Sequence, residues 1–315
     1  MEVIRSITNG LVHRRDPRVR DYVMQSSPEI TLGATAGYML LVAYGPRLMK
    51  NRPTPPLRLV MFLYNIGQVC LSAHMMHEFW VSRPSTRVCA PLETSDDRRA
   101  RRLVDACWLF HISKIIDFLD TVFLVLKKDH KRMTYLHVYH HASMNFGFWL
   151  GTLFCPGGST WIPGVLNSFV HCVMYSYYLL ASLGPRVRPY LWWKRYLTQL
   201  QLAQFAIIVL CTVMVQVEGG RCGMPFWTCS MTFVYLIVLT GLFVNFYVRC
   251  YLPMAGRGLS PSPAAAPPAI SSEASIPAPA PPPIRKAASC ERPSVMADVV
   301  RAILSHGVGC FTKED

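Results

Sequence analysis

The sequence is poor in charged residues, which make up 16% of its 315 positions, against roughly 25% in a soluble domain. Acidic side chains are the scarcest, with 18 Asp and Glu against 32 Lys and Arg, so the formal net charge is +14. Apolar residues form long blocks in which alternation of apolar and polar residues is rare, and no internal repeat is evident. These absences argue against a soluble domain and against a barrel of strands, and they predict a polytopic membrane protein built from helices.

Seven apolar blocks are each close to the ~20 residues that a helix needs to cross a bilayer. We therefore expect an all-α bundle of about seven transmembrane helices. The expected spans are 30–45, 57–80, 104–126, 134–154, 161–183, 199–217 and 226–249. The membrane domain is expected to cover residues 1–252. Residues 253–315 begin with a stretch of Pro, Ala and Ser that cannot bury a core, so a disordered tail is expected there.

Most loop cations fall on one side of this predicted bundle. With seven spans, the loops 46–56, 127–133 and 184–197 share a side with the C-terminus, whereas the opposite loop 218–225 holds a single cation, Arg221. Cytosolic loops are enriched in Lys and Arg, so the C-terminus is predicted to be cytosolic. The basic N-terminal segment and the run from Arg98 to Arg102 do not follow this pattern. Because the charge is spread over loops, no nucleic-acid partner is expected.

Most of the 11 cysteines fall inside apolar spans, where a thiol is an ordinary small core residue. Cys89 and Cys222 instead lie in loops on the predicted lumenal side, where disulfides persist. We expect a Cys89–Cys222 bridge. Cys155 and Cys229 are alternative partners, and two unpaired loop thiols are the other possibility.

Polar residues interrupt the span 104–126. Helical spacing brings Lys114, Asp117 and Thr121 to one face, with Asp120 at its margin. Charged groups at membrane depth are costly, so this set is expected to face the bundle interior. It can serve catalysis, or it can form an internal Lys–Asp pair that locks helix packing, and the two roles are compatible.

The next span, 134–154, contains the HxxHH pattern of His137, His140 and His141. Residues at i, i+3 and i+4 share a helix face, so the three imidazoles can converge on one cavity, with Asn145 a further turn along. Imidazoles can act as metal ligands, general bases or nucleophiles. A lone histidine is usually a core residue, but three beside a basic segment predict a functional site.

A third polar set lies in the span 161–183, where Asn167, His171, Tyr175 and Tyr178 fall on one helical face. Tyrosines near membrane ends are commonly an aromatic belt, but His171 adds a fourth imidazole at membrane depth. On the following helix, two glutamines can line the same cavity, namely Gln201 and Gln204.

Cations lie next to these polar sets. We call the segment that precedes the histidines the basic collar, consisting of Lys127, Lys128, Lys131 and Arg132. Two further cations follow a tryptophan pair and are Lys194 and Arg195. Such groups bind phosphates, so they can hold an anionic head group while interior residues act on a lipid tail.

Together these residues resemble the very-long-chain fatty acid elongases, condensing enzymes of the endoplasmic reticulum. The family's K-x-x-E-x-x-D-T motif is similar to Lys114, Asp117, Asp120 and Thr121, its HxxHH box to His137, His140 and His141, its N-x-x-x-H-x-x-M-Y-x-Y-Y stretch to Asn167, His171, Met174, Tyr175, Tyr177 and Tyr178, and its T-x-x-Q-x-x-Q-F element to Thr198, Gln201, Gln204 and Phe205. The motifs occur in family order between about Met24 and Tyr251, and the most similar subgroup acts on very long, often polyunsaturated, chains. Asp117 departs from the usual glutamate and shortens the reach of the carboxylate by one methylene.

The resemblance implies that the chain joins acyl-CoA to malonyl-CoA and releases CO2 and CoA to give 3-oxoacyl-CoA. It implies a membrane protein of the endoplasmic reticulum with no tightly bound cofactor and no metal. The expected partners are the two CoA substrates, membrane lipid, other enzymes of the elongation cycle and a second copy of the chain.

The resemblance also implies roles for the site residues. His140 is the expected nucleophile, which takes the acyl chain as an acyl-imidazole, and His171 is its partner or proton donor. His137 and His141 would orient the site, while Asp120 and Lys114 hold nearby polar groups. The expected substrate-binding residues are the basic collar with Lys194 and Arg195, and Asp117, Thr121, Asn145, Asn167, Tyr175, Tyr178, Gln201 and Gln204.

Three alternatives fit the sequence less well. A membrane di-iron desaturase or hydroxylase also uses HxxHH boxes, but two irons need about eight imidazoles, and this chain has one HxxHH pattern besides the shorter His74–His77 pair. A seven-span receptor or transporter fits the helix count but does not explain the buried imidazoles. A Cys172 thiolate beside His171 is the third, although neighbours in sequence point to different sides of a helix.

Overall fold

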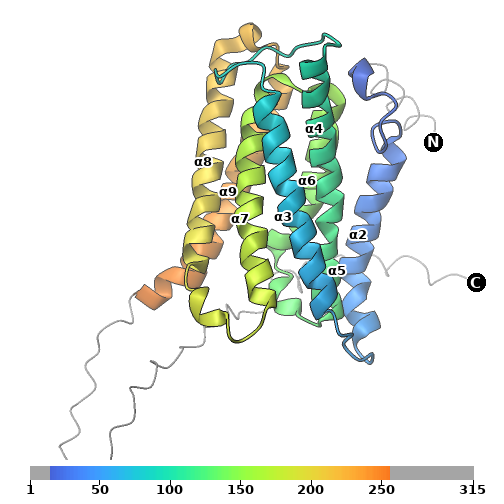
Figure 1. Ribbon diagram of the computed structural model, residues 1–315, viewed down its shortest axis with the longest axis vertical. Helices are drawn as coiled ribbons and strands as arrows, with labels where there is room; N and C mark the ends of the chain where they lie inside the picture. Colours follow the sequence, from blue (N-terminus) through green and yellow to red (C-terminus); the bar gives the residue numbers. More distant parts are fainter. Residues whose placement is uncertain (1–14, 256–315) are drawn as a thin grey trace, which may run out of the picture.

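The computed structural model describes residues 15–255, and this part of the chain is helical without strands. Figure 1 shows the long helices side by side in one bundle. The helices are α2 (Pro28–Met49), α3 (Arg58–Val81), α4 (Arg98–Ile116), α5 (Phe118–Leu126), α6 (Tyr135–Phe154), α7 (Trp161–Ser182), α8 (Lys194–Glu218) and α9 (Phe226–Ala255).

Local sequence explains where several helices begin. Pro28 opens α2, because its restricted φ suits the first helical turn. The Asp97 side chain accepts hydrogen bonds from the first N–H groups of α4, and its bond with the Ala100 N–H is the main reason that the pKa of this carboxyl is lowered. Thr134 caps α6 by accepting from the backbone N–H of His137 at 3.3 Å. The cap of α6 therefore also sets where the histidine pattern begins.

One predicted helix is wrong in its extent. The span 104–126 is not one helix, because α4 ends at Ile116 and α5 begins at Phe118, with Asp117 between them. Apolar residues flank Asp117, so hydropathy does not reveal the break, which coincides with buried side-chain bonds made by Asp117. The last helix, α9, ends at Ala255, close to residue 252, where the membrane domain is expected to end. The rest of the predicted tail lies outside the described residues.

The helices contact one another in a closed ring. The most extensive contact is between α3 and α7, and the ring continues through α8, α9, α6, α2 and the α4–α5 pair back to α3. The α4 helix also contacts α6. The polar segments of α4–α5, α6 and α7 therefore belong to neighbouring helices.

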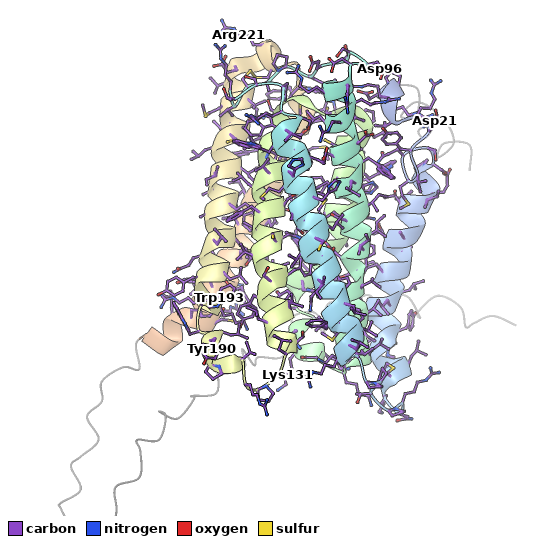
Figure 2. All side chains as sticks on the ribbon, viewed as in Figure 1. Asp21, Asp96, Lys131, Tyr190, Trp193 and Arg221 are labelled. Atoms are coloured by element: carbon purple, nitrogen blue, oxygen red, sulfur yellow. A yellow bond between two sulfur atoms is a disulfide. The ribbon has the colours of Figure 1, made fainter. Side chains whose placement is uncertain are left out.

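The three basic loops lie at one end of the bundle. Lys128 Nζ donates to the Lys50 carbonyl at 3.1 Å, and Arg58 Nη2 donates to the Leu183 carbonyl at 2.7 Å, which ties together the chain segments at that end. Figure 2 shows Lys131, Tyr190 and Trp193 near the same end, where α9 also finishes. We call it the basic end.

The opposite end is cross-linked. The structure contains a Cys89–Cys222 disulfide, which joins the α3–α4 loop to the α8–α9 connection across 133 positions. Leu92 N–H adds a backbone bond to the Cys222 carbonyl at 3.3 Å. Cys155 and Cys229, the alternative partners, are buried free thiols. A cross-link over so long a loop typically stabilises a fold by about 2–4 kcal/mol.

The distribution of polarity suits a membrane protein. Large apolar side chains are exposed along the outside of the bundle, among them Leu63, Leu210, Val217 and Val234. The interior in turn holds many buried polar groups, the reverse of a soluble domain. Within residues 15–255, three helices are long and apolar enough to cross a membrane, namely α3, α8 and α9.

Candidate active site

A buried ion pair lies at the junction of α4 and α5. Lys114 Nζ is 3.3 Å from Asp117 Oδ2, and both side chains are almost inaccessible. The ammonium also lies 4.5 Å from the centre of the Phe110 ring, a cation–π contact. Lys114 and Asp117 thus form the internal pair that their spacing predicts.

Asp117 is the centre of a hydrogen-bonded network that joins three helices. Gln68 Nε2 on α3 donates to Asp117 Oδ1 at 2.6 Å, and the Tyr175 hydroxyl on α7 lies 3.0 Å from the same oxygen. The Tyr175 hydroxyl is also 2.8 Å from Asp120 Oδ2. Gln68 further donates to Tyr64 at 3.0 Å.

Gln68 and Tyr64 are functional candidates that sequence reasoning missed. A signal was present, because Asn65, Gln68 and Ser72 follow i, i+3 and i+7 in an apolar helix and all three are buried. Such a polar stripe at membrane depth is expected to face the bundle interior.

The HxxHH residues lie in the first two turns of α6, which starts at the basic end. His137 Nε2 is hydrogen-bonded to Thr121 Oγ1 at 2.8 Å. The rings of His137 and His141 are 4.3 Å apart between centroids, and those of His140 and His141 are 5.4 Å apart. Seven residues of helix span roughly 10 Å, so the imidazoles are close to the basic collar.

His171 reaches the same region from α7. Its ring packs edge-on against Tyr175 with centroids 5.7 Å apart. His140 and His171 lie within electrostatic range of each other and of the Lys114–Asp117 pair. His140 remains partly accessible, whereas His171 is 9% exposed. Four imidazoles, two carboxyl groups and one ammonium therefore gather where α4–α5, α6 and α7 meet.

The other predicted interior residues are more dispersed. Asn145 is fully buried, donates to Thr35 Oγ1 at 2.9 Å and has an unpaired Oδ1. Asn167 is half-buried, and Tyr178 is 40% exposed with its ring edge-on to Tyr175. A separate buried pair, which sequence reasoning did not assign, joins His111 Nδ1 to Gln25 Nε2 at 2.9 Å.

Of the two predicted glutamines of α8, Gln201 contacts α7 and Gln204 is buried. Gln201 Nε2 lies 3.8 Å from the sulfur of Met174 on α7. Gln204 is 4% exposed, and its Oε1 has no hydrogen-bond partner. Such an unpaired buried acceptor is costly and calls for an explanation, for example a bound group.

The cations of the basic end are exposed. Lys127, Lys128, Lys131 and Arg132 of the basic collar are exposed, as are Lys194 and Arg195. Arg132 is paired with Asp129. Arg195 Nε donates to the Tyr247 hydroxyl on α9 at 2.9 Å, and Gln199 donates to the same oxygen at 2.7 Å. Sequence reasoning did not identify Tyr247 as a partner of Arg195.

No group of three or more His, Cys, Asp and Glu side chains within residues 15–255 is arranged to hold a metal ion. The histidine cluster instead adjoins a lysine, two carboxyl groups and a tyrosine. That arrangement can supply a nucleophile, a proton donor and a fixed positive charge.

Comparison with known proteins places this chain among enzymes of lipid metabolism. Residues 23–257 match the family described as "ELO: GNS1/SUR4 family". The chain is 37% identical over 250 residues to "Very long chain fatty acid elongase 7" of Drosophila melanogaster, covering 78% of this chain and 75% of the relative. It is 37% identical over 249 residues to "Very long chain fatty acid elongase 4" of Homo sapiens, with 77% and 79% covered. It is 40% identical over 240 residues to "Very long chain fatty acid elongase 2" of Rattus norvegicus, with 75% and 85% covered.

Proposed function

Since this chain belongs to the ELO: GNS1/SUR4 family, we propose that it is the condensing enzyme of fatty acid elongation, a very-long-chain 3-oxoacyl-CoA synthase. It joins a long or very long acyl-CoA, polyunsaturated chains included, to malonyl-CoA, and it releases CO2 and CoA. The observation that carries this proposal is the gathering of four histidines beside a buried Lys114–Asp117 pair in a chain similar to elongases.

The histidines supply the activated acyl group. His140 attacks the thioester carbonyl, its ring nitrogen forms a bond to the acyl carbon, and the CoA thiolate leaves. Malonyl-CoA then loses CO2, and the electron pair left on its C2 attacks the acyl-imidazole. His171 is the partner of His140, while the bond between His137 and Thr121 keeps the HxxHH segment in one orientation.

The CoA moieties bind at the basic end. Their phosphates pair with the basic collar and with Lys194 and Arg195, which are exposed there. In this arrangement the CoA phosphates lie outside the bundle and the thioester reaches the histidines in the first two turns of α6. The acyl chain runs further inward. The buried polar residues of the interior, Asn145 and Gln204 among them, line the acyl tunnel. The reaction needs no tightly bound cofactor.

The enzyme spans the endoplasmic reticulum membrane seven times, with the basic end and the C-terminus in the cytosol. This orientation is supported by the basic loops gathered at one end and by the disulfide at the other. Other enzymes of the elongation cycle and a second copy of the chain are its proposed partners. Family membership favours elongation over the di-iron desaturase alternative.

The test is incorporation of labelled malonyl-CoA by membranes that contain the protein, with saturated and polyunsaturated acyl-CoA donors of graded length. A product two carbons longer than the donor is expected. His140→Ala abolishes it, and His74→Ala, which changes an exposed histidine on α3, leaves it unchanged. Absence of product with every donor from well-folded protein would contradict the function, and full activity of His140→Ala would contradict the nucleophile.

A further inference from the structure

The Tyr175 hydroxyl bridges two carboxyl groups but carries a single hydrogen. It lies 3.0 Å from Asp117 Oδ1 and 2.8 Å from Asp120 Oδ2, and a phenol donates one hydrogen bond. If both aspartates were ionised, one of these contacts would lack a proton of its own, in a site with little water to screen the repulsion. We propose that Asp120 is a neutral carboxylic acid in the resting protein and supplies the proton that the condensation consumes. The role in proton supply rests on the proposed function.

Asp117 is the ionised member of the pair. Lys114 Nζ and Gln68 Nε2 approach its two oxygens, and both are groups that only donate. An ionised carboxylate accepts these bonds together with the one from Tyr175. The remaining proton therefore belongs to Asp120, which donates it to the Tyr175 oxygen.

Charge balance leads to the same assignment. The ionisable groups that act on Asp120 from the packed helices are Tyr38 on α2, Tyr64 on α3, Lys114 and Asp117 near the end of α4, and Tyr175 and Tyr178 on α7. Lys114 is the one cation among these described groups, and Asp117 already neutralises it. A second carboxylate would leave this cluster with a net negative charge at membrane depth, which is costly.

Asp120 also has the access that a proton donor needs. Its side chain is half-buried, whereas Asp117 is 3% exposed. Thr121, the next residue in the chain, is hydrogen-bonded to His137. Tyr175, the hydrogen-bond partner of Asp120, packs against His171. Asp120 is therefore linked through one residue to each histidine-bearing helix.

The proposed step balances in atoms and charge. When the His140 nitrogen bonds to the acyl carbon, the carbon–sulfur bond breaks and its electron pair stays on the CoA sulfur. The Asp120 proton moves to that sulfur, which gives CoA thiol, an Asp120 carboxylate and an acyl-imidazolium. Decarboxylation of malonyl-CoA then forms the new carbon–carbon bond and frees neutral His140. Asp120 regains a proton from water, so each turnover consumes one.

The first test reads the proton directly. Infrared spectra of the purified full chain in lipid nanodiscs at neutral pH are expected to show the carbonyl-stretch band of a protonated carboxylic acid, which shifts in D2O. Asp120→Asn removes this band. Asp105→Asn changes a carboxyl on α4 that accepts a hydrogen bond from Tyr22, and this variant retains the band. Absence of the band from the unsubstituted protein, or its persistence in Asp120→Asn, overturns the proposal.

The second test separates the chemical role from a structural one. An asparagine amide replaces a protonated carboxyl as donor to Tyr175, so Asp120→Asn should melt close to the unsubstituted protein, while Asp117→Asn melts well below it because Lys114 loses its partner. Release of CoA from acyl-CoA is expected to slow at least 100-fold in Asp120→Asn, as for the loss of a general acid, and Asp120→Glu restores part of that rate. Unchanged CoA release in Asp120→Asn would overturn the role in proton supply. Lack of elongation by the unsubstituted protein would count against the proposed function alone, since the infrared band does not depend on it.

Discussion

At the scale of single residues, Thr121 shows how a small side chain can position a larger one. Its hydroxyl is hydrogen-bonded to His137 Nε2 at 2.8 Å and lies 3.3 Å from the Tyr38 hydroxyl, and the side chain is fully buried. The hydrogen bond with Thr121 therefore holds the His137 ring in its tilted position against His141.

Replacing this hydroxyl by a methyl group tests that role. Thr121→Val keeps the volume but leaves buried Tyr38 and half-buried His137 without this hydrogen-bond partner, so we expect a loss of about 1–3 kcal/mol in stability and a fall in elongation activity. Thr240→Val is the matched control, because the buried Thr240 hydroxyl has no hydrogen-bond partner and its removal should be neutral. Thermal unfolding in detergent and malonyl-CoA incorporation measure both effects. Equal behaviour of the two variants would contradict the assignment.

At the scale of helices, the contact between α3 and α7 brings Gln68 and Tyr175 to Asp117. The two helices approach closely at Gly164 on α7, where an added Cβ would lie 2.7 Å from three atoms of the Phe79 ring on α3. Phe79 is 2% exposed and packs edge-on against Phe110 on α4. A side chain at position 164 would therefore push α3 and α7 apart or displace a buried aromatic cluster.

This contact leads to a prediction about packing. Gly164→Ala is expected to cost about 1–3 kcal/mol of stability because it overpacks the interface, and to lower activity by moving Tyr175 away from Asp117. Gly67→Ala, on α3, meets nothing within 4 Å of the added Cβ and should be neutral or stabilising by up to about 1 kcal/mol through helix propensity. Melting temperatures of the two variants provide the measurement, and an unperturbed Gly164→Ala would show that the helices are more loosely packed than described.

At the scale of the whole molecule, the two ends of the bundle differ in chemistry. The basic end has the cations of the loops 46–56, 127–133 and 184–197, whereas the other end has the Cys89–Cys222 disulfide together with the separate basic run from Arg98 to Arg102. Figure 1 shows the loops alternating between these ends. Cations favour the cytosolic side of a membrane and disulfides the oxidising side, so the three basic loops and the disulfide both support the proposed orientation.

Engineered glycosylation can measure this orientation. Glu93→Asn creates an N-x-S acceptor ahead of Thr94 and Ser95 in the cross-linked loop, and Pro53→Thr completes an N-x-T acceptor at Asn51 at the basic end. In microsomes, only the Glu93→Asn variant is expected to gain endoglycosidase-sensitive mass. Modification of Pro53→Thr instead would mean that the basic end faces the lumen and would contradict the proposed cytosolic binding of CoA.

What the sequence determined by itself follows from properties local to the chain. Apolar blocks predicted the helices, and spacing at i, i+3 and i+4 placed His137, His140 and His141 on one face. The expected number of spans predicted which loops share an end of the bundle, because consecutive helices run in opposite directions. The loop cations and the two loop cysteines then predicted how the two ends differ. These motifs also identified the family, which the comparisons confirm.

The tertiary structure alone decided how the polar groups pair. The break at Asp117 and its bonds to Gln68 and Tyr175 join residues 49 and 58 positions apart. The bond between Arg195 and Tyr247 joins residues 52 positions apart. Such contacts depend on the rotation and axial register of each helix against its neighbours, and hydropathy or spacing within one helix specifies neither. For that reason the sequence located the four histidines, whereas the contacts of Tyr175 with Asp117 and Asp120, from which the proton on Asp120 is proposed, are visible only in the packed bundle.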